Sequence, residues 1–203
     1  MDRVPSRMRR AFDALVAIPD EQWTEVERRV RIVDVTKGAL LLRQGEAVNW
    51  LGFLELGLLR NYQLVGEREV NLGFECEGGY VGAYEAYVQQ KPAEIGIQAL
   101  EESRLVRFER AELDALIAGH PCWRELFGRV SEVELVRRIE GERQARTHTP
   151  EQRYAELERA GSFLVRRLPL YHLASYLGVT PETLSRIRAR LGTDPGRGPG
   201  RRS

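Results

Sequence analysis

The pattern of apolar and polar positions divides the chain into three parts. Residues 6–17 and 20–30 have the spacing of two short helices, and Asp20 is placed to cap the second. From residue 31 to residue 108, short β-branched and leucine-rich runs alternate with glycines. A helical period returns at residue 111 and continues to residue 191. The pattern therefore predicts a β domain between helical segments.

The middle part contains seven short runs that are typical of strands. They are residues 31–35, 39–43, 50–56, 58–65, 69–76, 95–100 and 105–108. Glycines stand between most of them, where the chain must turn. So many short strands in about 80 residues predict a compact antiparallel sandwich or jelly roll.

A long helix is expected to follow this β domain. After a short helix at 111–118 and a break at His120–Pro121, helical spacing runs from residue 123 to residue 144. Its apolar positions are close to a coiled-coil seam, formed by Phe127, Val130, Val133 and Arg137. Such a seam packs either on its own domain or on the same helix of a second copy, and we favour the second copy.

A separate helical domain is predicted after Thr147–His148. Thr149 and Gln152 have the spacing of a capping box, with Pro150 at the first helical position, and predict a helix over 150–160. Two further short helices are predicted on either side of Gly178. Their apolar positions are Leu173, Ala174, Leu177, Leu184, Ile187 and Leu191.

The turn between these two helices has the expected chemistry. Gly178 can adopt a left-handed backbone, Thr180 can cap the second helix, and Pro181 suits its first position. Helices packed in this way form a helix-turn-helix. Glu182, Ser185 and Arg186 lie on the opposite face of the second helix, where side chains can reach base edges in a major groove. Any two packed amphipathic helices are the simpler alternative.

The charge distribution changes this picture more than the composition does. The chain has 203 residues, of which 42% are hydrophobic and 30% charged, and a net charge of +1. Residues 143–203 hold 12 arginines against 5 acidic residues, a net charge of +7, whereas residues 1–142 have a net charge of −6. A basic C-terminal third is typical of a domain that contacts phosphates.

Other classes of protein find little support. No apolar run is long enough to span a membrane, and the basic start is followed by Asp13 and Pro19, which do not suit a signal peptide. Two cysteines, Cys76 and Cys122, provide no disulfide framework, so we expect a cytoplasmic protein. No phosphate-binding loop, nucleophile elbow or His/carboxylate pair indicates an enzyme.

Together these features resemble the cyclic-AMP receptor protein/FNR superfamily of bacterial transcription regulators. The resemblance covers nearly the whole chain and is tightest over residues 149–154 and 174–188. It implies an α+β fold: an N-terminal antiparallel β-roll (a cupin-like jelly roll), a long dimerisation helix and a C-terminal helix-turn-helix. The corresponding boundaries are 1–120, 121–146 and 147–192, followed by a basic tail at 193–203 that we expect to be disordered.

The resemblance also implies roles for individual residues. The base-reading positions of the family fall on Glu182, Ser185 and Arg186, of which Arg186 can pair with guanine and Glu182 with cytosine. Contacts to DNA phosphates are implied for Thr180, Thr183, Arg188 and Arg190. Double-stranded DNA and a second copy of the chain are the expected partners. RNA polymerase is a further candidate partner, although the sequence does not identify a contact surface for it.

The sensor part departs from the family pattern. Members that bind cyclic AMP have a Gly-Glu pair and, about ten residues later, an Arg-Ser or Arg-Thr pair. Here these positions are Gly82–Ala83 and Ala93–Glu94, so both charged partners are missing and Glu94 would repel a phosphate. We therefore expect no control by cyclic AMP. The wing that follows the recognition helix in the family is expected to be truncated, with Arg197, Arg201 and Arg202 as possible replacements.

Other sensors of the family are also poorly matched. An iron–sulfur cluster needs about four thiolates, and the three histidines lack metal spacing, so we expect no cofactor and no metal. Cys76 and Cys122 are interpreted as ordinary buried thiols rather than a redox pair, and a haem ligand at His120 is the less favoured alternative. His172 is expected at the surface or facing phosphate. The prediction is a dimeric regulator that reads palindromic DNA; the alternatives are a ligand-sensing β-roll with weakened or nonspecific DNA binding, an architectural protein and a cyclic-nucleotide receptor.

Overall fold

The structure is a computed structural model that describes residues 6–160, 162 and 164–192. The chain divides into two compact units, residues 1–136 and residues 137–203. We call them the N-terminal and the C-terminal unit. The boundary lies within the long helix α5 (Pro121–Thr147), so this helix belongs partly to each unit. The helix is three residues longer at its C-terminal end than the sequence pattern predicted.

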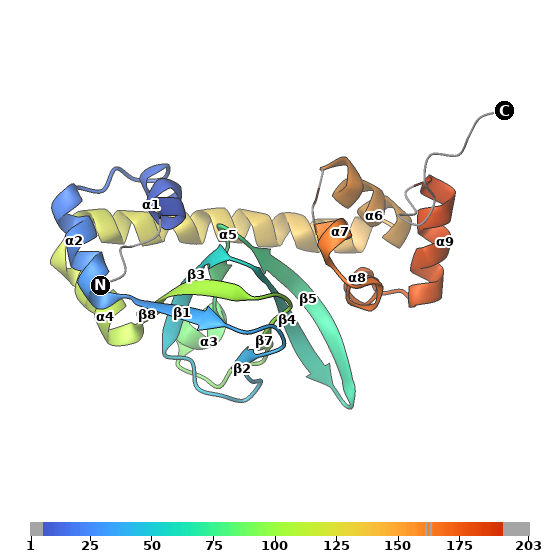
Figure 1. The fold of residues 1–203 in the computed structure, drawn as a ribbon, viewed down its shortest axis with the longest axis horizontal. Coiled ribbons are helices and arrows are strands. Elements are labelled where there is room, and N and C mark those ends of the chain that lie inside the picture. The colour runs from blue at the N-terminus through green and yellow to red at the C-terminus, as the bar shows by residue number, and fades with distance from the viewer. Residues whose placement is uncertain (1–5, 161, 163, 193–203) are drawn as a thin grey trace. The chain divides into compact units, whose positions relative to one another are not determined.

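The N-terminal unit is built on two antiparallel sheets of four strands each (Figure 1). The first sheet has the order β1-β8-β3-β6 and the second the order β2-β7-β4-β5. The strands are β1 (Arg31–Val35), β2 (Leu40–Leu42), β3 (Trp50–Leu56), β4 (Leu58–Val65), β5 (Arg68–Cys76), β6 (Tyr80–Val81), β7 (Gly96–Ala99) and β8 (Ser103–Glu109). This arrangement confirms the predicted β-roll and all seven predicted strands.

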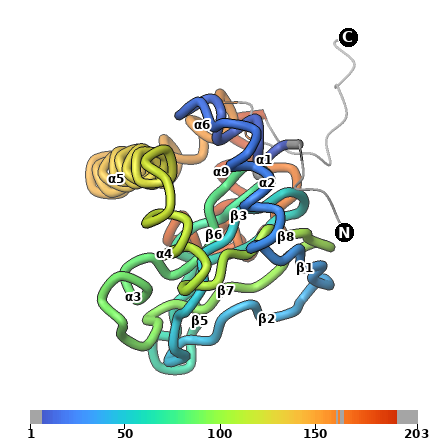
Figure 2. The backbone as a smooth tube through the Cα atoms, turned by 90° about the vertical axis from the view of Figure 1, so that its left-hand side faces the viewer, coloured from blue at the N-terminus to red at the C-terminus, as the bar shows by residue number. Residues whose placement is uncertain are grey.

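Helices cover one face of the first sheet. The helix α1 (Ser6–Asp13) packs on β3, and α4 (Arg110–Gly119) leads directly from β8 into α5 (Figure 2). Phe12 meets Phe53 edge to face at 5.7 Å between ring centroids, and Phe108 meets Phe127 of α5 at 6.3 Å. Side chains alternate across a strand, so Trp50 and Leu54 of β3 lie on the opposite face from Phe53. They point between the two sheets.

Two helical details at the start of the chain differ from the prediction. The helix α1 ends at Asp13 rather than at residue 17, and α2 (Asp20–Arg29) begins at Asp20 itself, with Pro19 at the capping position. Asp20 was therefore wrongly expected to be the cap. Its carboxylate instead pairs with Arg9 of α1, a long-range contact that local spacing does not indicate.

Three short elements were not predicted. They are β6, the helix α3 (Tyr84–Gln89) and the helix α7 (Leu164–Arg167). Each is too short to build a visible apolar period. Their conformation depends on neighbours, as in the pairing of Val81 in β6 with Gly52 in β3.

The C-terminal unit confirms the predicted helices and caps. In α6 (Pro150–Arg159), Thr149 and Gln152 form the reciprocal capping box. The helices α8 (Leu170–Leu177) and α9 (Pro181–Leu191) are separated by a three-residue turn. Gly178 has a φ of 75°, the left-handed conformation that glycine adopts without strain, and the Thr180 hydroxyl accepts a hydrogen bond from the Thr183 amide.

No helix in the described part of the chain is long and apolar enough to cross a membrane. The expectations about residues 193–203, which concern a disordered tail and a truncated wing, lie outside the described residues.

Candidate nucleic-acid interface and sensor site

The helix α9 has one buried face and one exposed face. Leu184 and Ile187 are 0% and 3% exposed, because their spacing of three places both against the rest of the unit. Glu182, Ser185 and Arg186 are all exposed, on the first two turns of the helix. The structure thus brings the three predicted base-reading residues together on one solvent-facing surface. We call this set the reading face.

Two residues of the reading face, Glu182 and Arg186, interact with each other and with the start of α9. The Glu182 backbone N–H, then the Thr180 hydroxyl and the nearby Arg186 guanidinium, hold the pKa of the Glu182 carboxyl below its usual value. Arg186 Nε donates to the Glu182 carbonyl at 3.4 Å. Glu182 therefore remains an anionic acceptor at neutral pH, and Arg186 provides the neighbouring donors.

The four residues expected at phosphates have different surroundings. Thr180 is exposed and Thr183 half-buried, and their hydroxyls lie 3.2 Å apart. Arg190 is 63% exposed and pairs with Glu151 at 2.9 Å. Arg188 is half-buried, donates to the Val165 carbonyl and lies 5.6 Å from the Tyr154 ring centroid. These contacts indicate a structural role for Arg188, whereas Thr180 and Arg190 face solvent.

His172 is not at the surface, contrary to expectation. It is 5% exposed, and its ring lies 4.1 Å from that of its neighbour Tyr171, which is 59% exposed. The helical period places His172 beside Leu173 and Ala174 on the inner side of α8. Burial of an imidazole depends on packing between helices, so the sequence alone did not reveal it.

The predicted seam of α5 divides into buried and exposed residues. Phe127 and Val130 are half-buried against the core of the N-terminal unit. Val133 is 48% exposed, and Arg137 is also exposed. With Leu135, Val136 and Ile139, which are 55–58% exposed, Val133 forms an apolar surface of four side chains. We call these four residues the α5 stripe.

The residues at the family's effector position carry no cation. Ala83 and Ala93 are 6% and 2% exposed, and Glu94 is exposed. The backbone of Ala93 is bonded to the loop before β3, through Gly45 and Glu46, at 2.7 and 2.8 Å. A Cβ added to Gly82 would lie 2.8 Å from the Leu51 side chain. Ala83 and Ala93 are therefore packed within the protein, whereas Glu94 faces solvent.

The cysteines do not form a pair. Neither Cys76 nor Cys122 takes part in a disulfide; Cys122 is buried as expected, whereas Cys76 is only half-buried. Burial raises the pKa of the Cys122 thiol, whose sulfur lies 3.0 Å from His120 Nδ1. Within the described residues no group of three or more His, Cys, Asp or Glu side chains could hold a metal ion.

Comparison with known proteins agrees with this geometry. Residues 32–120 match the family model of the cyclic nucleotide-binding domain. A search of curated proteins found no match. Among solved structures, the c-di-GMP responsive global regulator CLP of Xanthomonas campestris aligns with a TM-score of 0.69 at 15% identity, over 89% of this chain and 96% of that chain.

Two other regulators have the same fold. FixK2 from Bradyrhizobium japonicum aligns with a TM-score of 0.67 at 18% identity, over 85% of this chain and 90% of its own. The catabolite activator protein of Thermus thermophilus aligns with a TM-score of 0.51 at 19% identity, over 94% and 91%. Residues 32–120 therefore resemble a cyclic nucleotide-binding domain, and the chain has the fold of the cyclic-AMP receptor protein/FNR family of regulators.

Proposed function

We propose that this protein is a transcription regulator that binds DNA sequence-specifically as a homodimer and is not controlled by cyclic AMP. The observation that carries the proposal is the pair α8 and α9, interpreted as a helix-turn-helix. Its reading face presents an anionic acceptor, a hydroxyl and a guanidinium on adjacent exposed positions. These are the groups that discriminate base edges in a major groove.

The charge of the C-terminal part supports binding to phosphates. Residues 143–203 have a net charge of +7 on a chain whose total is +1. Neutralising DNA phosphates with arginine releases counterions, so the affinity should fall steeply with salt concentration. Thr180 and Arg190 are the exposed candidates for positioning contacts.

The α5 stripe supports a dimer. Four large apolar side chains on one helix remain about half exposed, and a second copy of the helix could bury them. A two-fold dimer presents two reading faces, which suits a palindromic site. The proposed dimer contact therefore includes Val133 but not Phe127 and Val130, which pack on the N-terminal unit.

The sensor part supports independence from cyclic AMP. A cyclic phosphate needs a cation, and a ribose needs an acceptor, at the positions where this chain has Ala93 and Ala83. Glu94 adds a negative charge beside them. A signal other than cyclic AMP, or control by abundance, agrees better with these residues.

The first test is selection of bound sequences from a random DNA pool with the ligand-free protein. We expect a palindrome with half-sites about one helical turn apart. Enrichment of no motif, together with equal affinity for the selected and scrambled DNA at moderate salt, would contradict the proposal. That outcome would favour a ligand-sensing β-roll with weak DNA binding.

Two arginine variants separate base reading from phosphate contact. Arg186→Ala should cost about 1–3 kcal/mol of binding free energy on the selected site, concentrated at one base pair per half-site. Arg190→Ala should weaken binding to all sequences alike and lower the salt slope by about one. Mobility-shift titrations at several salt concentrations measure both effects. If Arg186→Ala weakened every sequence equally, the protein would be a nonspecific architectural binder.

A further inference from the structure

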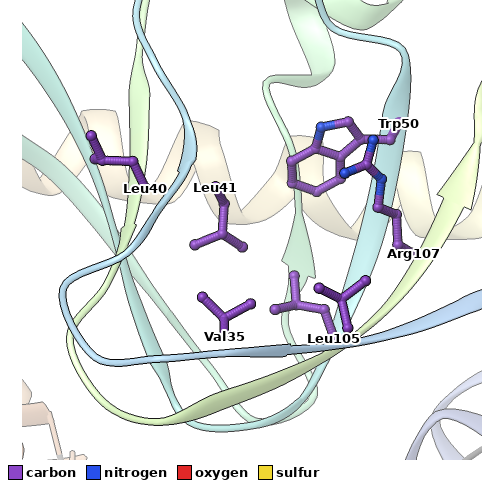
Figure 3. A pocket seen from close by; sticks show the side chains of 7 residues that line it. Val35, Leu40, Leu41, Trp50, Leu105 and Arg107 are labelled. Atoms are coloured by element: carbon purple, nitrogen blue, oxygen red, sulfur yellow. The ribbon is translucent and has the colours of Figure 1, made fainter.

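A cavity of about 200 Å³ lies between the two sheets of the N-terminal unit (Figure 3). Its walls come from both sheets: β2 on one side, and β1, β3 and β8 on the other. The lining residues are Val33, Val35, Leu40, Leu41, Trp50, Leu105 and Arg107. Aliphatic side chains surround most of the space, and Trp50 and Arg107 lie together at one side of it.

This cavity is separate from the effector position of the domain family. None of Gly82, Ala83, Ala93 and Glu94 lines it. Those four residues lie around α3, whereas the cavity is lined by residues of β1, β2, β3 and β8. A ligand here would therefore use a different set of residues from those that the family's effector would use.

The one charged side chain of the lining is Arg107. Its guanidinium lies over the Trp50 ring, 4.9 Å from the ring centroid. Glu109 engages one side of it, with Nε–Oε1 at 2.8 Å and Nη2–Oε2 at 3.4 Å. A guanidinium has five N–H donors in a planar fork, so donors remain for a second acceptor.

We propose that this cavity binds an aliphatic carboxylic acid of medium chain length, with its chain among the aliphatic side chains and its carboxylate on Arg107. Aliphatic walls favour a hydrocarbon chain, and a preformed guanidinium favours a planar carboxylate. The volume exceeds the roughly 150 Å³ of an apolar cavity that binds benzene. The proposal does not depend on DNA binding.

The lining also argues against more polar ligands. A nucleotide would leave its ribose and base without partners among five aliphatic side chains, and an unpaired buried polar group is costly. Glu109 already neutralises part of the Arg107 charge, so a singly charged carboxylate suits the site better than a doubly charged phosphate.

Calorimetry on the full-length protein with octanoate and 1-octanol tests the proposal, because these probes share a chain and differ in the charged group. We expect octanoate to bind at least about tenfold more tightly than 1-octanol. Arg107→Met keeps an apolar stem and should remove this preference while leaving 1-octanol within about twofold. Arg104→Met is the matched control: Arg104 also lies on β8 but is 51% exposed, pairs with Asp34 and should change neither affinity.

A cavity-filling variant tests whether the probes bind in this cavity, and it leaves Arg107 unchanged. Val35→Phe should weaken both probes by at least about tenfold, because the added ring occupies the space of the chain. Near-UV circular dichroism checks that each variant is folded. The proposal fails if the wild type binds neither probe, if it binds both equally, or if Val35→Phe leaves both affinities unchanged. Equal losses in Arg104→Met and Arg107→Met would also overturn it, since the effect would then be one of overall charge.

Discussion

Gly57, in the turn between β3 and β4, lies so close to Ser103 of β8 that the turn has no room for a side chain. Gly57 has a φ of 107°, and a Cβ at this position would lie 2.7 Å from the Cα of Ser103 and closer still to its hydroxyl. The Gly57 amide also donates to a Glu77 carboxylate oxygen at 3.0 Å. The backbone here therefore needs glycine for two reasons, conformation and space.

We predict that Gly57→Ala destabilises the N-terminal unit by about 2–5 kcal/mol. Overpacking contributes roughly 1–3 kcal/mol, and the positive φ contributes roughly 1–2 kcal/mol. Urea unfolding followed by tryptophan fluorescence measures the change, because all three tryptophans lie in this unit. Gly73→Ala is the control. Nothing lies within 4 Å of a Cβ added at Gly73, so this variant should change the unfolding free energy little. Equal costs at both positions would contradict this account of Gly57.

Tyr80 gives a prediction about alkaline pH. Burial, with a smaller contribution from Glu134, raises the pKa of Tyr80 from 10.0 to about 12. The folded state therefore favours the neutral phenol, so its contribution to stability is complete below pH 10 and is lost as the pH rises towards 12. We expect Tyr80→Phe to reduce the fall in Tm between pH 10 and pH 12 relative to the wild type.

Scanning calorimetry across this pH range checks the prediction, and Phe keeps the ring packing against Phe12 and Phe53. Tyr171 is 59% exposed, and Tyr171→Phe serves as the control. Its pH profile should follow that of the wild type. If Tyr80→Phe also followed the wild type, Tyr80 would not be the group that titrates.

At the scale of elements, α5 has two different apolar surfaces. Phe127 and Val130 pack on the β-roll, and the α5 stripe remains exposed along the same helix. Val133, Val136 and Ile139 follow one another at spacings of three, and Leu135 lies four residues before Ile139. Residues three and four apart are neighbours on a helix surface, so these side chains are contiguous.

We predict that Leu135→Glu combined with Ile139→Glu raises the dissociation constant of the dimer by at least about 100-fold, because carboxylates would be buried without partners. Sedimentation equilibrium measures the association. Arg138→Glu, which changes an exposed residue between them, should have a much smaller effect. Val130→Ala should lower the unfolding free energy of the N-terminal unit and leave association unchanged. A wild type that stays monomeric at micromolar concentration would rule out the proposed interface.

At the scale of the whole molecule, two compact units with different chemistry are joined through one continuous helix. The N-terminal unit contains the residues that match the cyclic nucleotide-binding domain, and the C-terminal unit contains the reading face. Regulation of one by the other would require a ligand with different affinities for two arrangements of the molecule. Cyclic AMP is not expected to be that ligand.

We predict that isothermal titration with cyclic AMP or cyclic GMP gives a dissociation constant of about 1 mM or higher, or no binding. A dissociation constant of 1 mM corresponds to a binding free energy of roughly −4 kcal/mol. Neither nucleotide should change the affinity for the selected DNA site, since linked binding is reciprocal. Micromolar binding would show that other groups replace the missing cation and acceptor. Octanoate in the same titration tests the cavity independently of the effector position, because neither Ala83 nor Ala93 lines the cavity.

Much of the fold could be predicted because its signals are local. The capping box of Thr149 and Gln152, the Thr180 cap and the left-handed Gly178 depend on residues a few positions apart, and all are present in the structure. The short elements β6, α3 and α7 could not be predicted, because so few residues show no apolar period and their conformation depends on residues outside them. The same holds for Asp20, whose carboxylate pairs with Arg9 instead of capping α2.

The sequence by itself predicted the longer helices and strands in their order, Glu182, Ser185 and Arg186 as candidate base-reading residues, and alanines where cyclic-AMP receptors have charged partners. The order of elements follows from residue spacing, and the site residues follow from side-chain chemistry together with the resemblance to the family. Only the tertiary structure decided which side chains are buried. It buried His172, half-buried Arg188, left the α5 stripe exposed and formed a cavity beside Arg107. The physical reason is that exposure depends on packing between segments far apart in the chain, which a local pattern does not record.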